Sequence, residues 1–247
     1  MVPPAPRSAP VRVRPFRRIE YLGAMSKVIQ HIYIIPLFVS AALGLRCIRL
    51  RWPTPYITFS ILVLSVFFVE VLAILWKYHI IGIPNHPWSS SNLWIYNVFL
   101  LPQYLLYMAL YYQVIRSAAI RKIIIALAVF YTVFALLNIF YIQHINNIDS
   151  LTLAVSSGIV IFLTIAYFEQ LRKEEQLIRL TTHPMVWISL GAFIFHTANL
   201  PYLIGLNYLI HTNLPLAIAL FYIFLALNCI MYTLYSVALL CPRPLHR

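Results

Sequence analysis

Long apolar segments recur along this chain, and short polar segments separate them. A helix needs about 20 apolar residues to cross the hydrocarbon core of a bilayer. The composition agrees with repeated crossing, because 62% of the 247 residues are hydrophobic and 10% are charged. A soluble domain is about half apolar and about a quarter charged. We therefore expect an integral membrane protein and exclude a soluble fold.

Seven of these segments are long enough to cross a membrane. Each should be helical, because backbone polar groups inside lipid must find their hydrogen bonds within the segment. The predicted spans are residues 28–46, 55–76, 92–115, 122–142, 150–171, 185–206 and 214–241. The fold class predicted for residues 25–247 is thus an all-α membrane protein, a seven-transmembrane helix bundle.

Basic residues cluster in every second connection between the spans. They are Arg46, Arg49 and Arg51, then Arg116, Arg121 and Lys122, then Arg172, Lys173 and Arg179, and finally Arg243 and Arg247. The connections between these clusters carry only Lys77. Because cytoplasmic loops are enriched in Lys and Arg, the N-terminus is predicted to lie outside and the C-terminus in the cytoplasm, in the cell inner membrane.

Residues 1–24 conflict with that orientation, because this Pro-rich segment carries five arginines on the side predicted to be outside. The segment has no apolar stretch of the kind found in a signal peptide. We expect translation to begin at Met25. The alternative is a translated, disordered basic tail that reverses the topology or adds a cytoplasmic arm. The remaining basic excess follows topology, so no nucleic-acid partner is expected.

Polar side chains inside the predicted spans are the candidates for function. Glu70 is the only carboxylate well inside a span, and a charged acid near the bilayer centre costs about 2.5 to 3.5 kcal/mol. It should therefore face the bundle interior. His196 and Asn199 share one helix face because they are three residues apart. With Asn97 and Tyr96, they are predicted to form an outward-facing polar ligand site; the alternative is that each hydrogen-bonds a neighbouring helix as packing.

Two sets of residues recur at helical spacing and are predicted to pack between helices and to anchor them at the membrane interface. They are Tyr104, Tyr107 and Tyr111, and Asn228, Tyr232 and Tyr235.

Several chemistries find no support in the sequence. There is no CxxC pair and no HExxH helix, and the last span has no lysine for a retinal Schiff base. We predict no metal site and no cofactor. We also expect no enzyme, because Glu70 and His196 are the only candidate acid and base and no nucleophile accompanies them.

A resemblance rests on residues in three spans. They are Asn138 and Phe140, then Tyr167, Phe168 and Glu169, and then Pro184, Trp187, Ile188, Gly191, Phe195 and Pro201. In this pattern residues 25–241 resemble small, uncharacterised seven-helix membrane proteins of Bacteroidota, which are similar to the membrane sensor modules of bacterial histidine kinases. The resemblance implies a sensory or receptor-like role. Only six residues follow the last span, so signalling would require a separate partner such as a histidine kinase.

The predicted function is therefore that of a receptor-like or sensor-accessory membrane protein. The alternative is a small transporter or channel in which Glu70 and His196 relay protons or cations. No residue pattern identifies the ligand.

Overall fold

The computed structural model describes residues 31–78, 91–142, 149–173 and 182–242. All of their helices belong to one compact unit, Ile32–Arg247. The helices are α2 (Ile34–Arg49), α3 (Thr54–Lys77), α4 (Leu93–Val114), α5 (Ala118–Leu137), the π-helix η3 (Asn138–Ile142), α6 (Ser150–Lys173), α7 (Pro184–Thr212) and α8 (Leu214–Leu240). The described ranges contain no strand.

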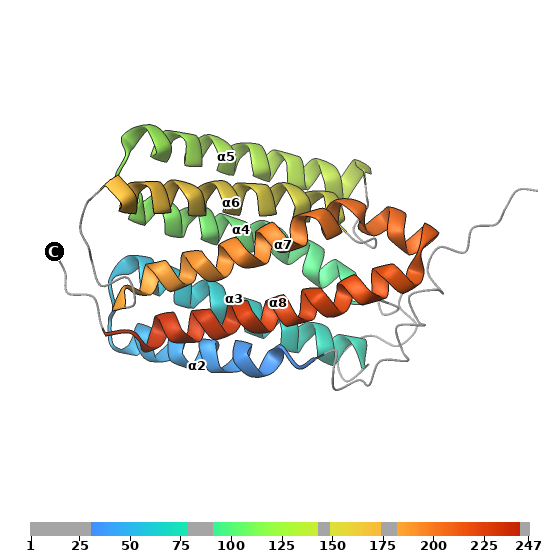
Figure 1. Ribbon diagram of the computed structural model, residues 1–247, viewed down its shortest axis with the longest axis horizontal. Coiled ribbons are helices and arrows are strands. Elements are labelled where there is room, and N and C mark those ends of the chain that lie inside the picture. Colours follow the sequence, from blue (N-terminus) through green and yellow to red (C-terminus); the bar gives the residue numbers. More distant parts are fainter. Residues whose placement is uncertain (1–30, 79–90, 143–148, 174–181, 243–247) are drawn as a thin grey trace, which may run out of the picture. The chain divides into compact units, whose positions relative to one another are not determined.

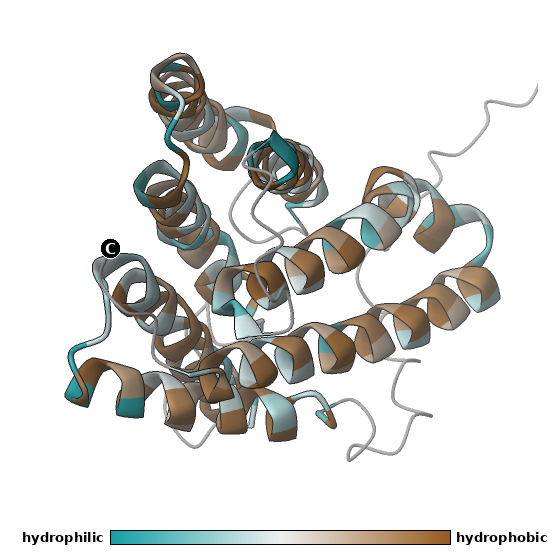
Figure 2. Ribbon diagram, turned by 60° about the vertical axis from the view of Figure 1, so that its left-hand side comes forward, coloured by the Kyte–Doolittle hydropathy of each residue, from teal (hydrophilic) through white to brown (hydrophobic). Residues whose placement is uncertain are grey.

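Among the described residues, six helices are long and apolar enough to cross a membrane, with α5 and η3 counted together as Ala118–Ile142. The other five are α3, α4, α6, α7 and α8. Apolar residues cover much of the outward-facing helix surface (Figure 2), including the exposed side chains of Phe68, Val129 and Ile204. The predicted all-α, multi-pass membrane protein is thereby confirmed.

Helix ends follow local sequence signals. A proline stands in the first turn of α3, α7 and α8, where its missing N–H costs no hydrogen bond. Ser117 caps α5 by accepting a hydrogen bond from the Ile120 N–H, and Asn213 caps α8 by accepting one from the Leu216 N–H.

Three helices differ from the predicted spans by three residues or more, and one of them is α5, which begins at Ala118 instead of residue 122. Within the described residues α2 begins at Ile34 and continues to Arg49, past the predicted end at residue 46. In the same way, α7 continues to Thr212, past residue 206. Hydropathy marks the part of a helix that lipid can cover, whereas the helix itself can continue beyond it with polar residues. Figure 1 shows α7 changing direction along its length, and Pro201 lies inside this helix, where a proline produces a kink.

Six helices form a closed ring around a common interior. Neighbours in the ring are α2, α3, α4, α6, α7 and α8, and contacts between α8 and α2 close it. The most extensive contacts join α7 to α8 and α6 to α7. Helix α5 lies outside the ring against α4 and α6 (Figure 1).

The ring interior is rich in tyrosine. Tyr111 and Tyr235 are among the largest fully buried side chains, and Tyr104, Tyr107 and Tyr232 are buried as well. The Phe59 ring of α3 meets the Tyr235 ring of α8 edge-on, with centroids 4.9 Å apart. The predicted packing role of these tyrosines is confirmed, whereas their burial does not fit the predicted anchoring at the membrane interface.

Helices α7 and α8 approach closely at Gly191. A Cβ at this position would lie 3.2 Å from Tyr235 Cε1, 3.3 Å from Leu234 Cβ and 3.4 Å from the Met231 carbonyl oxygen. Small residues allow such close approach between helices in membranes.

We predict that Gly191→Ala lowers the free energy of unfolding by about 1 to 3 kcal/mol, because the added methyl overpacks the α7–α8 contact. Gly158→Ala on α6 is the matched control, since no atom lies within 4 Å of a Cβ there. It should be neutral, or stabilising by up to about 1 kcal/mol through helix propensity. Thermal unfolding in detergent measures both variants, and equal effects would contradict the assigned contact.

Candidate functional site

Three helices meet at the carboxylate of Glu70. Glu70 Oε2 accepts hydrogen bonds from Tyr33 Oη at 2.8 Å and from Tyr96 Oη at 2.9 Å. Tyr33 directly precedes α2, Glu70 lies in the second half of α3, and Tyr96 lies in the first turn of α4. These residues, called the Glu70 cluster, stand at the end of the bundle where α2 begins, α3 ends and α4 begins.

All three members of the Glu70 cluster are half-buried. Hydrogen bonds to a charged acceptor contribute about 1.5 to 3 kcal/mol, more than bonds between neutral groups. Tyr232 of α8 interacts electrostatically with both Glu70 and Tyr96. Through its two hydrogen bonds the carboxylate joins α3 to the start of α2 and to α4.

His196 of α7 lies in a second, fully interior group. Its side chain is 2% exposed, and its Nδ1 shares a hydrogen bond of 3.0 Å with Ser157 Oγ of α6. Its ring lies against Tyr104 and Tyr107 of α4, with centroids 5.8 Å and 5.9 Å away. These four residues are called the His196 cluster. Tyr107 Oη in turn lies 2.7 Å from Tyr235 Oη of α8.

Tyr232 lies near both clusters. Glu70, Tyr104 and Tyr107 are all near enough to affect its hydroxyl electrostatically. Among the described residues, the hydrogen bonds of Glu70 and of His196 go to different partners. The structure thus joins Glu70 directly to Tyr96 and places His196 in a neighbouring cluster.

The two predicted asparagines are buried. Asn97 follows Tyr96 on α4 and is 4% exposed, and Asn199 on α7 is 2% exposed. Asn199 Nδ2 has no hydrogen-bond partner among the described residues. Both asparagines therefore belong to the interior of the ring, whereas Glu70 and Tyr96 remain partly accessible.

Sequence reasoning missed Tyr33 and Ser157. Their hydrogen-bond partners are 37 and 39 residues away in the chain, and neither residue type is unusual in a membrane helix. A tyrosine at the start of the first span is the only signal the sequence offers, and interfacial anchoring explains such a tyrosine equally well.

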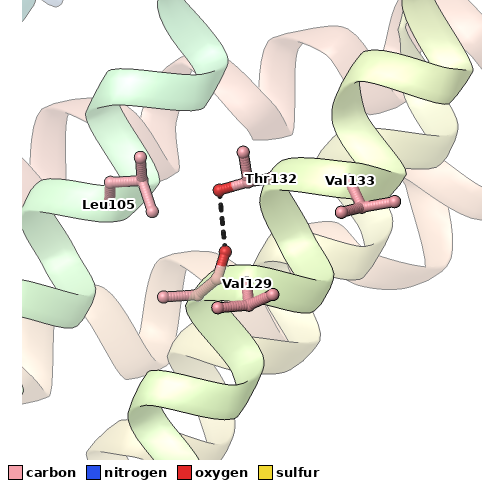
Figure 3. A pocket seen from close by; sticks show the side chains of 5 residues that line it. Leu105, Val129, Thr132 and Val133 are labelled. Carbon is pink, nitrogen blue, oxygen red and sulfur yellow. Dashed lines mark hydrogen bonds between the residues drawn. The ribbon is translucent and has the colours of Figure 1, made fainter.

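A shallow hollow of about 280 Å³ lies between α4 and α5 (Figure 3). Its lining residues are Leu105, Ala128, Val129, Thr132 and Val133. The one hydroxyl, Thr132 Oγ1, donates to the Ala128 carbonyl at 2.8 Å. None of the five predicted site residues lines this hollow, and its apolar walls suit lipid contact.

Within the ranges that the structure describes, no three His, Cys, Asp or Glu side chains come together as metal ligands. Comparison with protein-family models, with curated proteins and with solved structures finds no match to this chain.

We predict that Glu70→Gln and Tyr96→Phe are coupled in a double-mutant cycle by about 0.5 to 3 kcal/mol, because Gln removes the charge that strengthens the Tyr96–Glu70 hydrogen bond and Phe removes its donor. Glu70→Gln combined with Tyr111→Phe is the control pair, since the Tyr111 hydroxyl donates to Ser189 Oγ instead. The control pair should be additive. Unfolding in detergent measures the free energy of unfolding of each variant. Additivity in both pairs would show that Glu70 and Tyr96 are not energetically coupled.

Proposed function

We propose that this chain is a receptor-like or sensor-accessory membrane protein that binds its ligand at the Glu70 cluster and signals through a separate partner protein. The observation that supports this is the pair of hydrogen bonds from Tyr33 and Tyr96 to Glu70. A ligand that engages this carboxylate competes with contacts that hold three helices together. Binding would thereby change the relative stability of alternative helix arrangements.

The proposed ligand class is a small organic cation. A carboxylate attracts the positive charge, and tyrosine rings attract cations over their faces. Tyr33 and Tyr96 contact Glu70 directly, and Tyr232 interacts with it electrostatically. Because the Glu70 cluster is half-buried at one end of the bundle, a ligand can approach it without entering the ring interior.

The outward orientation rests on where the charges lie. Helices α2 and α4 begin at the Glu70 cluster and end near Arg49 and Arg116. The basic residues therefore occupy the end of these helices away from Glu70, which is the cytoplasmic end under the positive-inside rule. We propose α2 as the seventh span, because residues 28–33 extend its apolar sequence.

Helix α8 is the proposed route to the cytoplasmic side. Helix α8 packs against α2, and its Tyr232 is near enough to Glu70 to be affected by the charge of that carboxylate. A change at the Glu70 cluster would shift α2 and α8 together. Their cytoplasmic ends, at Arg49 and Leu240, are where a partner such as a histidine kinase would detect the shift.

A topology test follows from this orientation. A reporter fused after Arg247 should be active only if it functions in the cytoplasm, and one inserted at Asn146 only if it functions outside the inner membrane. If each reporter is instead active only on the opposite side of the membrane, the bundle has the reverse orientation and the Glu70 cluster lies on the cytoplasmic side.

Choline serves as the probe for ligand binding. We predict that the protein in nanodiscs binds radiolabelled choline and that Glu70→Gln weakens binding about tenfold or more, a loss of at least about 1.4 kcal/mol. Glu169→Gln is the matched control, because Glu169 is an exposed carboxylate paired with Arg172 and Lys173. Equal affinity in all three proteins would contradict a cation site at Glu70.

The alternative function is transport. It is supported by Tyr232, which is near enough to both Glu70 and the His196 cluster to be affected by them electrostatically. Sealed proteoliposomes separate the two functions. A receptor binds choline without accumulating it inside the vesicle. Accumulation that is lost in both Glu70→Gln and His196→Ala would favour transport instead.

A further inference from the structure

The helix faces that form the hollow between α4 and α5 continue toward the basic ends of these helices. Leu105 of α4 faces Thr132 of α5 across the hollow (Figure 3). Tyr112 lies seven residues after Leu105 on α4, and Arg121 lies seven residues before Ala128 on α5. Residues seven apart share one face of an α-helix. Tyr112 and Arg121 therefore stand on the same faces as the hollow, two turns nearer the basic end.

The two faces meet at Arg121. Its guanidinium lies over the Tyr112 ring, 5.4 Å from the ring centroid, where the aromatic face attracts a cation. Its Nε donates a hydrogen bond of 2.6 Å to the Ile115 carbonyl, which uses one of the five N–H donors of a guanidinium. Gln170 of α6 accepts from the Arg116 N–H at 2.7 Å and so fixes the same turn. These contacts hold the guanidinium at one end of the hollow.

The positive charge at this end has no acidic partner among the described residues. Arg121 is half-buried and Lys122 beside it is exposed. The ion pairs within the described ranges instead join Glu169 to basic residues of α6. The positive-inside rule explains why basic residues gather at this end. It does not explain why Arg121 is stacked and hydrogen-bonded beside an apolar hollow, and this combination suits a ligand with an anionic head and an apolar tail.

The hollow lies at the depth of lipid acyl chains. Ala128 and Val133 lie 7 and 12 residues after Arg121 in the continuous helix α5, which places them about 10 and 18 Å further along its axis. The headgroup region of one leaflet is about 5 to 7 Å thick, and the hydrocarbon half beneath it is about 15 Å thick. A guanidinium at headgroup level therefore puts the hollow within the hydrocarbon of the same leaflet.

We propose that the hollow, Arg121 and Lys122 form a binding site for an anionic phospholipid. The phosphate would contact the two basic side chains, and one acyl chain would lie in the hollow against Leu105 and Ala128. The planar fork of arginine matches phosphate geometry, and basic groups at the ends of membrane helices attract anionic headgroups. The lipid would fill the space between α4 and α5, the helix outside the ring. This site is separate from the Glu70 cluster and does not depend on the function proposed for it.

A second copy of the chain is the other occupant that an apolar helix face could receive. Two copies in one membrane have the same orientation, and a two-fold contact brings the same surface of each copy together. A dimer through the hollow would thus bring Arg121 and Lys122 of both copies to the same depth. Such like charges repel one another, whereas the phosphate of an anionic lipid compensates them.

Native mass spectrometry of the purified full chain in detergent tests the site. The protein is titrated with phosphatidylglycerol and, separately, with phosphatidylcholine of the same acyl chains. Phosphatidylglycerol should bind one site at least about tenfold more tightly, and Arg121→Gln combined with Lys122→Gln should remove this preference. Ala128→Phe keeps both charges and should weaken phosphatidylglycerol binding about tenfold, because the ring takes the place of the acyl chain. This variant also covers the case in which the Arg121 variant does not fold.

Two control proteins match these variants. Arg46→Gln combined with Arg49→Gln removes the same charge from exposed positions of α2, and Ala226→Phe makes the same substitution at an exposed position of α8. Both should bind phosphatidylglycerol as the wild type does. Equal losses in the two basic pairs, or equal affinity of the wild type for the two lipids, would overturn the proposal. Protein dimers that disappear in Ala128→Phe would overturn it as well and assign the hollow to a second copy.

Discussion

A carboxylate within a membrane bundle must find hydrogen-bond partners among the helices around it, and the arrangement at one end of this molecule depends on that requirement. Tyr33 and Tyr96 donate to the same oxygen of Glu70. Their donation fixes the start of α2 and the start of α4 against the second half of α3. Because each bond crosses between helices, the polar group that is most costly in lipid also determines which helix ends meet.

The closed ring extends this constraint to the rest of the bundle. Contacts run from α2 through α3, α4, α6, α7 and α8 back to α2, so a change in one helix position is transmitted in both directions. The interior carries hydroxyls that are satisfied between helices, including the Tyr107–Tyr235 and Tyr111–Ser189 pairs. Gly191 permits the close approach of α7 and α8. Among the described helices, α5 and η3 lie outside the ring and are held by contacts with α4 and α6 and by the hydrogen bond from Asn138 to Asp149.

Hydropathy predicted the helices well, because a bilayer imposes both length and apolarity on each span. The cost of a charged group in lipid correctly placed Glu70 toward other helices. It did not indicate Tyr33 as a partner, since the pairing of residues 37 apart depends on which helices adjoin. The peripheral place of α5 escaped prediction for the same reason. Asp149 lies between the predicted spans 122–142 and 150–171, so the search for polar residues inside the spans did not include it.

The central claim is that occupancy of the Glu70 cluster changes the packing of α2 and α8 at the opposite end of the bundle. Double electron–electron resonance between spin labels at Arg49 and Leu240 tests this most directly, after Cys47, Cys229 and Cys241 are replaced. Both label sites are exposed at helix ends. The account predicts that saturating choline shifts the distance distribution by about 2 Å or more, and that Glu70→Gln abolishes the shift. An unchanged distribution in a protein shown to be saturated with choline would contradict it.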